Sequence, residues 1–268
     1  LEEARLLAAS GVKELIIVAQ DITRYGIDLY GKVCLTELLK ELCKLDFRWV
    51  RLHYLYPELI DDELIDEIAS EDKIVKYLDI PIQHINDDIL RRMNRRGNGE
   101  YVKELFAKLR REIPGLVLRT SLITGLPGEG EEEFEQLCDF LKEYKLERVG
   151  AFAFSPEEGT RAAEMEYPDT EIARQRADMV AEIQSRIMDD YNESCIGKTM
   201  QVLCEGYDPD EESYYGRTFA DSPDIDGKIW FTAEKHIKTG DFADVRVVDA
   251  YDGELVGVLE EEYNDDCE

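Results

Sequence analysis

Short apolar runs alternate with longer amphipathic stretches over the first 165 residues of the chain. Runs of this length predict buried strands, at residues 14–19, 49–56, 76–83, 117–123 and 148–154. Apolar residues at helical spacing predict helices at residues 1–10, 35–45, 61–70, 100–112 and 131–144, with a shorter helical stretch from Asp87. Strands that alternate with such helices form βαβ units, whose right-handed crossovers give a parallel sheet or barrel.

Polar residues follow each predicted strand. These residues are Gln20 and Asp21, Tyr54 and Tyr56, Gln83 and His84, residues 124–129, and Ser155. Ligands of parallel α/β folds bind beyond the carboxyl ends of the strands, so we expect one shared binding mouth there. An open doubly wound sheet is the alternative fold. It would normally carry a glycine fingerprint after its first strand, and Gln-Asp-Ile-Thr at residues 20–23 is not one.

The segment at residues 118–134 is the most informative of these strand ends. A predicted strand is followed by a turn with Gly125, Gly128 and Gly130, and then by a helix that opens on acidic residues. Acidic residues stabilise the first turn of a helix, and glycines permit positive φ and a close approach of a ligand to the backbone. An ordinary strand-to-helix turn explains this segment alone, but repetition of the unit along the chain favours a binding site.

The last third of the chain has a different pattern. Residues 170–192 predict a long polar helix with an apolar side, which connects to four short alternating strands at residues 200–205, 214–218, 228–232 and 244–250. Five or so short strands in this region, four of them with these ranges, are separated by Asp-, Pro- and Gly-rich turns and predict a small closed β-barrel related to the OB type. The predicted division is a barrel-like domain at residues 1–165, a connector at 166–197, the β-barrel at 198–262 and a disordered acidic tail at 263–268.

The chain is strongly acidic, with a formal net charge of −29 over 268 residues. Residues 198–262 alone hold 6 basic and 17 acidic residues, a net charge of −11. Such a surface repels phosphate backbones and attracts basic proteins, although generic solubility accounts for acidity of the whole chain equally well. No apolar run is long enough to span a membrane, so we expect a soluble protein.

The six cysteines are Cys34, Cys43, Cys138, Cys195, Cys204 and Cys267. None is paired at C-x-x-C or C-x-x-x-C spacing, so we expect no metal ligands in this chain, neither a zinc knuckle nor an iron–sulfur loop. Cys43 and Cys138 lie at apolar helix positions and are predicted to be packed thiols. Few cysteines without a disulfide pattern indicate a reducing, cytoplasmic location. The chain begins without Met inside an amphipathic helix, which indicates a piece of a longer protein.

Four segments together resemble the methylthiotransferase branch of the radical SAM enzymes. They are QDITRYGIDLYG at residues 20–31, DIPIQH at 79–84, TSLITGLPGE at 120–129 and SPEEGT at 155–160. The C-terminal barrel resembles a TRAM domain. The resemblance covers nearly the whole chain and implies an α/β fold: a radical SAM parallel (β/α) barrel, incomplete at its N-terminus, plus a small all-β TRAM barrel. The first strand and its cluster loop would be missing from residues 1–165.

Two types within this branch compete. The tRNA-modifying type usually shows Gly-Gln-Asn at the first motif and Gln-Ser-Gly at the third, whereas this chain has Ala-Gln-Asp at residues 19–21 and Gln-His-Ile at 83–85. With GRTFADSPDIDG at residues 216–227, it is similar to the type that methylthiolates an aspartate of small-subunit ribosomal protein twelve. The acidic barrel favours this basic partner over nucleic acid, because a barrel that grips tRNA should be basic. Methylthiolation of tRNA and a non-catalytic ribosome- or protein-binding module remain alternatives.

The resemblance implies S-adenosylmethionine and two 4Fe-4S clusters as cofactors. The cluster cysteines would lie outside this chain, so the polypeptide by itself is expected to be inactive. The implied cofactor-binding residues are Gln20, Gln83, His84, Arg95, Thr124, Gly125 and Phe152, and the implied substrate-binding residues are Asp21, Tyr25 and Asp28. No catalytic residue can be named.

These candidates also have structural interpretations. Arg95 is equally well a solvated base at a helix end, and His84 is favoured as a packed, hydrogen-bonded imidazole. Asp21 and Asp28 are equally residues of a solvated turn. For Phe152, as for its neighbour Phe154, a place in the core is the alternative.

Overall fold

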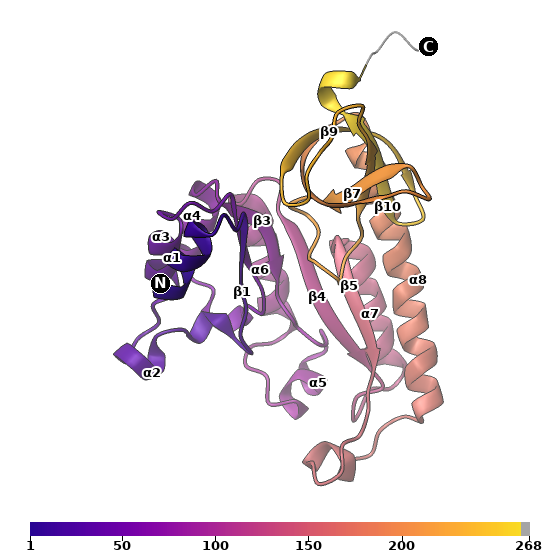
Figure 1. Ribbon diagram of the computed structural model, residues 1–268. Coiled ribbons are helices and arrows are strands. Elements are labelled where there is room, and N and C mark those ends of the chain that lie inside the picture. Colours follow the sequence, from indigo (N-terminus) through magenta and orange to yellow (C-terminus); the bar gives the residue numbers. More distant parts are fainter. Residues whose placement is uncertain (264–268) are drawn as a thin grey trace. The chain divides into compact units, whose positions relative to one another are not determined.

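The computed structural model describes residues 1–263 (Figure 1). Contacts along the chain divide it into two compact units. We call the unit formed by Ile16–Lys44 and Val50–Ile187 the sheet unit, and the unit formed by Leu1–Leu15, Leu45–Trp49 and the chain from Met188 the barrel unit. Part of the predicted acidic tail, with Cys267, lies outside the described residues. The domain boundaries predicted from the sequence stay a prediction.

Five strands form one sheet in the order in which they occur in the chain. They are β1 (Glu14–Ile17), β2 (Trp49–Leu52), β3 (Ile74–Asp79), β4 (Val117–Thr124) and β5 (Arg148–Ala153). The pairs β2–β3, β3–β4 and β4–β5 are parallel. A doubly wound sheet reverses its strand order at a switch point, whereas this order continues in one direction as in a (β/α) barrel. The barrel-type winding is therefore confirmed and the doubly wound alternative is wrong.

Six helices precede or connect the strands, and three of them begin at a residue whose side chain caps the first turn. They are α1 (Glu2–Ala9), α3 (Leu35–Leu42), α4 (Asp62–Ser70), α5 (Asp87–Arg92), α6 (Gly99–Glu112) and α7 (Glu131–Tyr144). The side chains of Asp61, Asn86 and Asn98 accept backbone N–H groups at the starts of α4, α5 and α6. Such caps satisfy donors that a helix leaves open at its first turn. The longer helices bury an apolar side, as α6 does with Leu105, Phe106 and Leu109.

Residues 20–31, for which the sequence predicts neither a strand nor a helix, contain two helical turns. These are η1 (Ile22–Arg24) and α2 (Ile27–Tyr30). The Asp21 carboxylate accepts the Thr23 N–H at 3.0 Å and also the Thr23 hydroxyl, which closes the first turn. Gly26 has a φ of 95° and lies so close to Cys34 that a side chain would not fit. The polar composition of this segment did not indicate the two helical turns.

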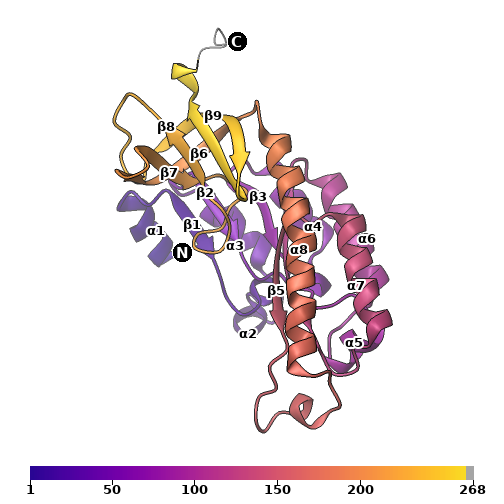
Figure 2. The same cartoon turned by 90° about the vertical axis from the view of Figure 1, so that its right-hand side faces the viewer.

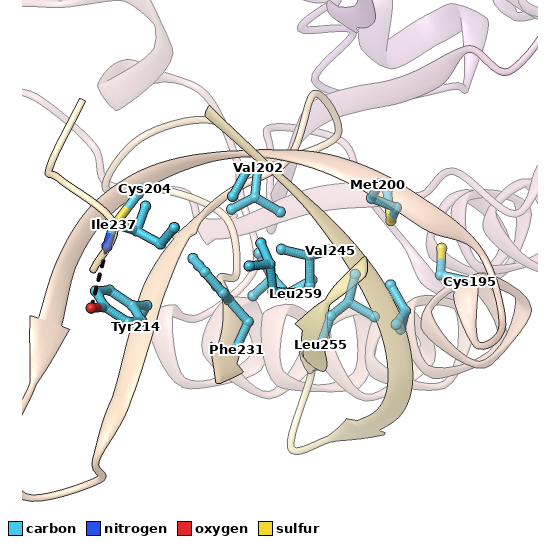
Figure 3. Packing of buried hydrophobic residues seen from close by; sticks show 13 residues of the cluster. Cys195, Met200, Val202, Cys204, Tyr214, Phe231, Ile237, Val245, Leu255 and Leu259 are labelled. Carbon is cyan, nitrogen blue, oxygen red and sulfur yellow. Dashed lines mark hydrogen bonds between the residues drawn. The ribbon is translucent and has the colours of Figure 1, made fainter. Parts of the chain in front are cut away.

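The barrel unit ends in a closed five-stranded barrel in the order β10-β8-β7-β6-β9. Its strands are β6 (Thr199–Asp208), β7 (Ser213–Arg217), β8 (Ile229–Thr232), β9 (Phe242–Tyr251) and β10 (Glu254–Leu259). The last strand, β10, had no prediction, and it closes the barrel by pairing in parallel with β8 and antiparallel with β9. The inward residues form one apolar core around Val202, Phe231 and Val245 (Figure 3). The hydroxyl of Tyr214 at its rim accepts the Ile237 N–H at 3.3 Å.

The helix predicted at residues 170–192 is α8 (Thr170–Cys195), which continues past its predicted end. Its part up to Ile187 belongs to the sheet unit and lies alongside α7 (Figures 1 and 2). Its last residue, Cys195, is buried in the barrel core. Within residues 1–263, none of the helices has the length and apolar character required to cross a membrane.

The motif at residues 216–227 has a structural role inside the barrel unit. The Arg217 guanidinium is buried and pairs with Glu14 at 2.7 Å and with Glu205 at 2.6 Å. Burial lowers the pKa of Arg217, but these two carboxylates outweigh it and the pKa is raised. The Asp221 carboxylate accepts the Thr218 N–H and hydroxyl, which folds the turn that follows β7. This motif therefore joins β7 to the start of β1.

We expect Phe231→Ala to lower the free energy of unfolding of the barrel unit by about 3–5 kcal/mol, because it opens a cavity in the barrel core. Tyr251, an aromatic residue of the same barrel that is 78% exposed, supplies the control, and Tyr251→Ala should change stability by less than about 0.5 kcal/mol. Both tryptophans, Trp49 and Trp230, belong to the barrel unit, so urea unfolding followed by tryptophan fluorescence reports on it. Equal effects of the two substitutions would contradict the assigned core.

Candidate functional site

A cavity of about 350 Å³ lies at the carboxyl ends of β4 and β5. We call it the strand-end cavity. Its lining consists of Arg92, Met93, Ile123, Leu126, Pro127, Phe152, Ala153, Phe154, Ser155, Ala162 and Met165. All of these residues belong to the sheet unit. The lining is apolar and aromatic with one charged side chain, which is the usual make-up of a small-molecule site.

The turn after β4 forms one wall of this cavity. Gly125 has a φ of 75°, and a side chain there would overlap with Ala173 of α8. Leu126 and Pro127 then line the cavity, and the Glu129 N–H donates to the Leu126 carbonyl at 2.9 Å to close the turn. The glycine therefore serves the close packing of α8, and the apolar residues that follow it face the cavity.

Three buried polar side chains lie beneath this turn. Glu129 is 3% exposed, Arg176 of α8 is 5% exposed and His84 is fully buried. We call them the buried ion group. Glu129 Oε1 accepts from the Gly125 N–H at 2.9 Å and from Arg176 at 2.7 Å, and Glu129 Oε2 lies 3.4 Å from His84 Nε2. Arg176 also pairs with Glu131 at 2.6 Å and lies over the Phe134 ring.

Burial and pairing act in opposite directions on the charges of this group. Burial raises the pKa of Glu129, but the hydrogen bonds from His84, Gly125 and Arg176 outweigh it, so that the pKa is lowered. Burial lowers the pKa of Arg176, but its hydrogen bonds to Glu129 and Glu131 have the larger effect, so the pKa of Arg176 is raised. The two groups therefore stay ionised at neutral pH, and a buried ion pair of this kind tolerates the loss of neither partner.

The structure places three of the predicted cofactor residues at or next to the strand-end cavity. Phe152 is 55% exposed and lines it. Thr124 is buried behind the wall, where its hydroxyl donates to the Ala173 carbonyl at 2.7 Å, and Gly125 follows it. The roles predicted for these residues in cofactor binding stay predictions.

The residues predicted at the end of β3 hold the sheet together. Gln83 is half-buried with a φ of 71°, and its backbone bonds to Ser121 and Ile123 of β4 at 2.9 Å each. His84 follows it into the buried ion group, which agrees with the packed, hydrogen-bonded imidazole favoured from the sequence. Its ring reaches no surface in this structure.

Arg95 and Arg92 show what the sequence could not resolve. The guanidinium of Arg95 lies over the Tyr56 ring, 4.5 Å from its centre, and Arg95 does not line the strand-end cavity. Arg92, which had no prediction, does line it, and its guanidinium lies about where a side chain on Gly128 would be. The segment has four arginines at residues 91, 92, 95 and 96. Of these four arginines, the one that lines the cavity is Arg92, the last residue of α5.

The candidates after β1 lie on the short helical segment described above. Gln20 and Asp28 are exposed, whereas Asp21 is half-buried and caps η1. Tyr25 is half-buried, and burial together with its hydrogen bond to Tyr30 raises its pKa. None of these residues lines the strand-end cavity, so their predicted roles toward cofactor or substrate stay predictions.

The thiols of the described residues do not suit an iron–sulfur cluster. Cys34, Cys43, Cys138, Cys195 and Cys204 are all buried, and none of them forms a disulfide. Burial raises the pKa of Cys43 to about 11, and it also raises the pKa of Cys138 and of Cys204. Cluster ligands have to be thiolates, which such burial opposes. No group of three potential metal ligands occurs among residues 1–263. The packed state predicted for Cys43 and Cys138 is confirmed.

Comparison with known families identifies two matches. The radical SAM superfamily pattern matches residues 1–141, and the TRAM domain pattern matches residues 196–259. Curated relatives named ribosomal protein uS12 methylthiotransferase RimO occur in Caldanaerobacter subterraneus subsp. tengcongensis and in Lachnoclostridium phytofermentans. They are each 48% identical, over 96% and 97% of this chain. The chain spans 59% and 60% of their respective lengths.

Solved structures give a more distant match. Coproporphyrinogen III oxidase of Escherichia coli, described as a radical SAM enzyme, has a TM-score of 0.47 and 18% identity to this chain. The match covers 57% of this chain and 36% of that chain.

We expect stability to fall in acid partly through Glu129. Because folding lowers the pKa of Glu129, its ionised form contributes stability above the ordinary value of 4.5, and this contribution is lost as the pH falls through the folded-state value. Glu129→Gln should cost about 1–3 kcal/mol at pH 7 and should lose less stability than the unchanged chain on acidification. Urea unfolding followed by circular dichroism at several pH values measures this difference.

Glu131→Gln is the matched control for this experiment, since Glu131 contacts the same arginine with a side chain that is 89% exposed. Its stability should follow that of the unchanged chain at each pH. A Glu129→Gln chain with an unaltered pH dependence would show that Glu129 does not carry the assigned charge.

Proposed function

The chain belongs to the radical SAM superfamily, and from this premise we propose that it acts as part of a methylthiotransferase. The reaction adds a methylthio group to an aspartate side chain of a small-subunit ribosomal protein, uS12. The single observation that carries the proposal is the 48% identity to relatives named for this activity, extended over both the sheet unit and the barrel. The residue pairs Gln20–Asp21 and Gln83–His84 support the protein-modifying type over the tRNA-modifying type.

The strand-end cavity fits the adenosyl part of S-adenosylmethionine. An adenine ring needs an apolar or aromatic surface, which Phe152 offers with an exposed face. The carboxylate of the cofactor needs a cation, and Arg92 lines the cavity with a guanidinium that forms no hydrogen bond or ion pair with the side chains of residues 1–263. When bound, S-adenosylmethionine supplies the radical chemistry of the superfamily. The protein residues hold and orient it.

The two 4Fe-4S clusters that we propose for the whole enzyme do not fit the cysteines described in this chain. These thiols are buried, and among residues 1–263 they form no group of three potential metal ligands, so no step of the reaction is assigned to them. We propose that the cluster ligands are supplied by other cysteines, and that this chain by itself provides the cofactor wall and the small barrel.

The small barrel supports a basic protein as substrate. Its 6 basic residues face 17 acidic ones, and two of the basic residues are already neutralised: Arg217 by Glu14 and Glu205, and Lys235 by Glu261. Binding of nucleic acid depends on cations that remain free to meet phosphates. A ribosomal protein offers the complementary charge, and modifying it would place the enzyme in the cytoplasm.

We expect S-adenosylmethionine at millimolar concentration to give saturation-transfer NMR signals from its adenine protons with the intact chain. Phe152→Ala should weaken this binding by about tenfold, because aromatic stacking of a base contributes about 1–3 kcal/mol. Ile172→Ala removes another exposed apolar side chain of the sheet unit, on α8, and should leave binding unchanged. Absence of adenine signals with the unchanged chain would favour the non-catalytic binding module.

We expect a lysine- and arginine-rich peptide to bind the chain in low salt and to lose affinity by about tenfold or more as ionic strength rises. Asp210→Lys with Glu211→Lys reverses two exposed charges at the turn between β6 and β7 and should reduce this binding. Fluorescence-anisotropy titration in low and in high salt measures the peptide binding, and the same titration with tRNA should show no binding at either salt concentration. Tight, salt-sensitive tRNA binding would instead support the tRNA-modifying type.

A further inference from the structure

His84 holds an unusual position beneath the strand-end cavity. It is fully buried, yet it belongs to the loop after β3 and meets a carboxylate from the turn after β4. We infer that His84 is a positioning residue for this cavity: it presents an Nε2–H to Glu129, and Glu129 in turn holds the N–H of Gly125 at the start of the turn that forms the cavity wall. The identity of the ligand in this cavity rests on the function proposed above. The contact between His84 and Glu129 is independent of that proposal.

The position of the proton follows from the other ring nitrogen. The Asn86 N–H donates to His84 Nδ1 at 3.0 Å, so Nδ1 has to be an acceptor with a free lone pair. A neutral imidazole has one acceptor and one donor, and the proton therefore lies on Nε2. Asn86 also caps α5 with its side chain, which fixes the backbone that makes this bond. The chain itself selects the tautomer.

The carboxylate is arranged to receive that proton. Glu129 Oε1 already accepts from Gly125 and from Arg176, whereas Oε2 has no other partner among the described residues. His84 Nε2 likewise has none, and the two atoms lie 3.4 Å apart. Each is buried, and a buried polar atom without a partner costs about 1–3 kcal/mol. Neither atom forms a hydrogen bond with any of the described residues, and since they face each other at 3.4 Å, an Nε2–H directed at Oε2 is the arrangement that would satisfy both.

The contact acts on the cavity through the turn. Glu129 comes at the end of the turn, and its side chain bonds to the backbone of Gly125 at the beginning, so the carboxylate spans the whole turn. Leu126 and Pro127, which line the cavity, lie between these two points. Arg176 pulls the same carboxylate toward α8. Without a donor from His84, hydrogen bonds would fix only Oε1 of the Glu129 carboxylate, and Oε2 would have no partner among the described residues.

Two substitutions separate this role from simple packing. In His84→Gln the side-chain amide can place its N–H near the position of Nε2, so that the donor to Glu129 remains and the acceptor for Asn86 is lost. In His84→Asn the side-chain oxygen can take the position of Nδ1, so that the acceptor remains and the donor is lost. The two variants have similar size and polarity, and each removes one function of the ring.

Amide hydrogen exchange of the intact chain, resolved by NMR, reads the two functions separately. In His84→Asn, exchange at Gly125 should accelerate by about fivefold to tenfold, as expected for the loss of a stabilising hydrogen bond, while Asn86 keeps its protection. In His84→Gln the opposite pattern should occur. Equal acceleration at both amides in both variants would show that the ring only fills space, and would overturn the inference.

The unchanged chain gives a second test that needs no variant. It has three histidines, and their ¹⁵N chemical shifts distinguish the two neutral tautomers. We expect His84 to show the Nε2–H form, and the Nδ1–H form would contradict the assignment directly. Adenine signals of S-adenosylmethionine should persist with His84→Gln and weaken by about fivefold with His84→Asn.

The outcomes for the inference and for the proposed function can be told apart. If the unchanged chain gives no adenine signals while the exchange patterns and the tautomer are as expected, the proposed cofactor fails and the positioning role stands. If the unchanged chain binds S-adenosylmethionine and the two variants behave alike, the positioning role fails and the proposed function stands.

Discussion

A carboxylate buried away from water has to be neutralised by the groups around it, and Glu129 imposes this requirement on the carboxyl ends of the strands. Its partners come from three places in the chain: His84 after β3, Gly125 after β4, and Arg176 in α8. These three partners are far apart from one another in sequence, and only Gly125 is close to Glu129 itself. The charge therefore fixes how these three segments meet, and the strand-end cavity lies above the place where they do.

The elements with strong local signals could be predicted from the sequence. The bounds expected for α7 agree with the structure because its acidic first turn and apolar spacing point to the same helix. By contrast, β10 has valines on its half-buried face as well as leucines on its buried face, so its sequence shows no polar and apolar alternation, and the strand is identified only by its pairing with β8 and β9. No local pattern could show that pairing, and without it the barrel could not be closed.

The candidate site shows the same limit at the level of single residues. Gly125 was predicted to let a ligand approach the backbone, whereas the group that lies against it in this structure is Ala173, nearly fifty residues away in the chain. Composition indicates that a glycine is needed and does not identify the neighbour. Likewise, the exposed aromatic face of Phe152 and the orientation of Arg92 depend on where β5 and α5 end. These are tertiary facts that no spacing rule supplies.

The acidic character of the chain makes the few buried cations informative. In a chain with 61 acidic and 32 basic residues, a surface lysine or arginine finds a carboxylate easily, and such exposed pairs contribute little stability. Arg176 and Arg217 differ, because each is buried and meets two carboxylates. Removing either cation would leave an uncompensated buried charge, so each can act as a fixed joint: Arg217 between β7 and the start of β1, and Arg176 between α8 and the turn after β4. Within the sheet unit, Arg176 thereby holds α8 against the turn after β4, whose residues Leu126 and Pro127 line the strand-end cavity.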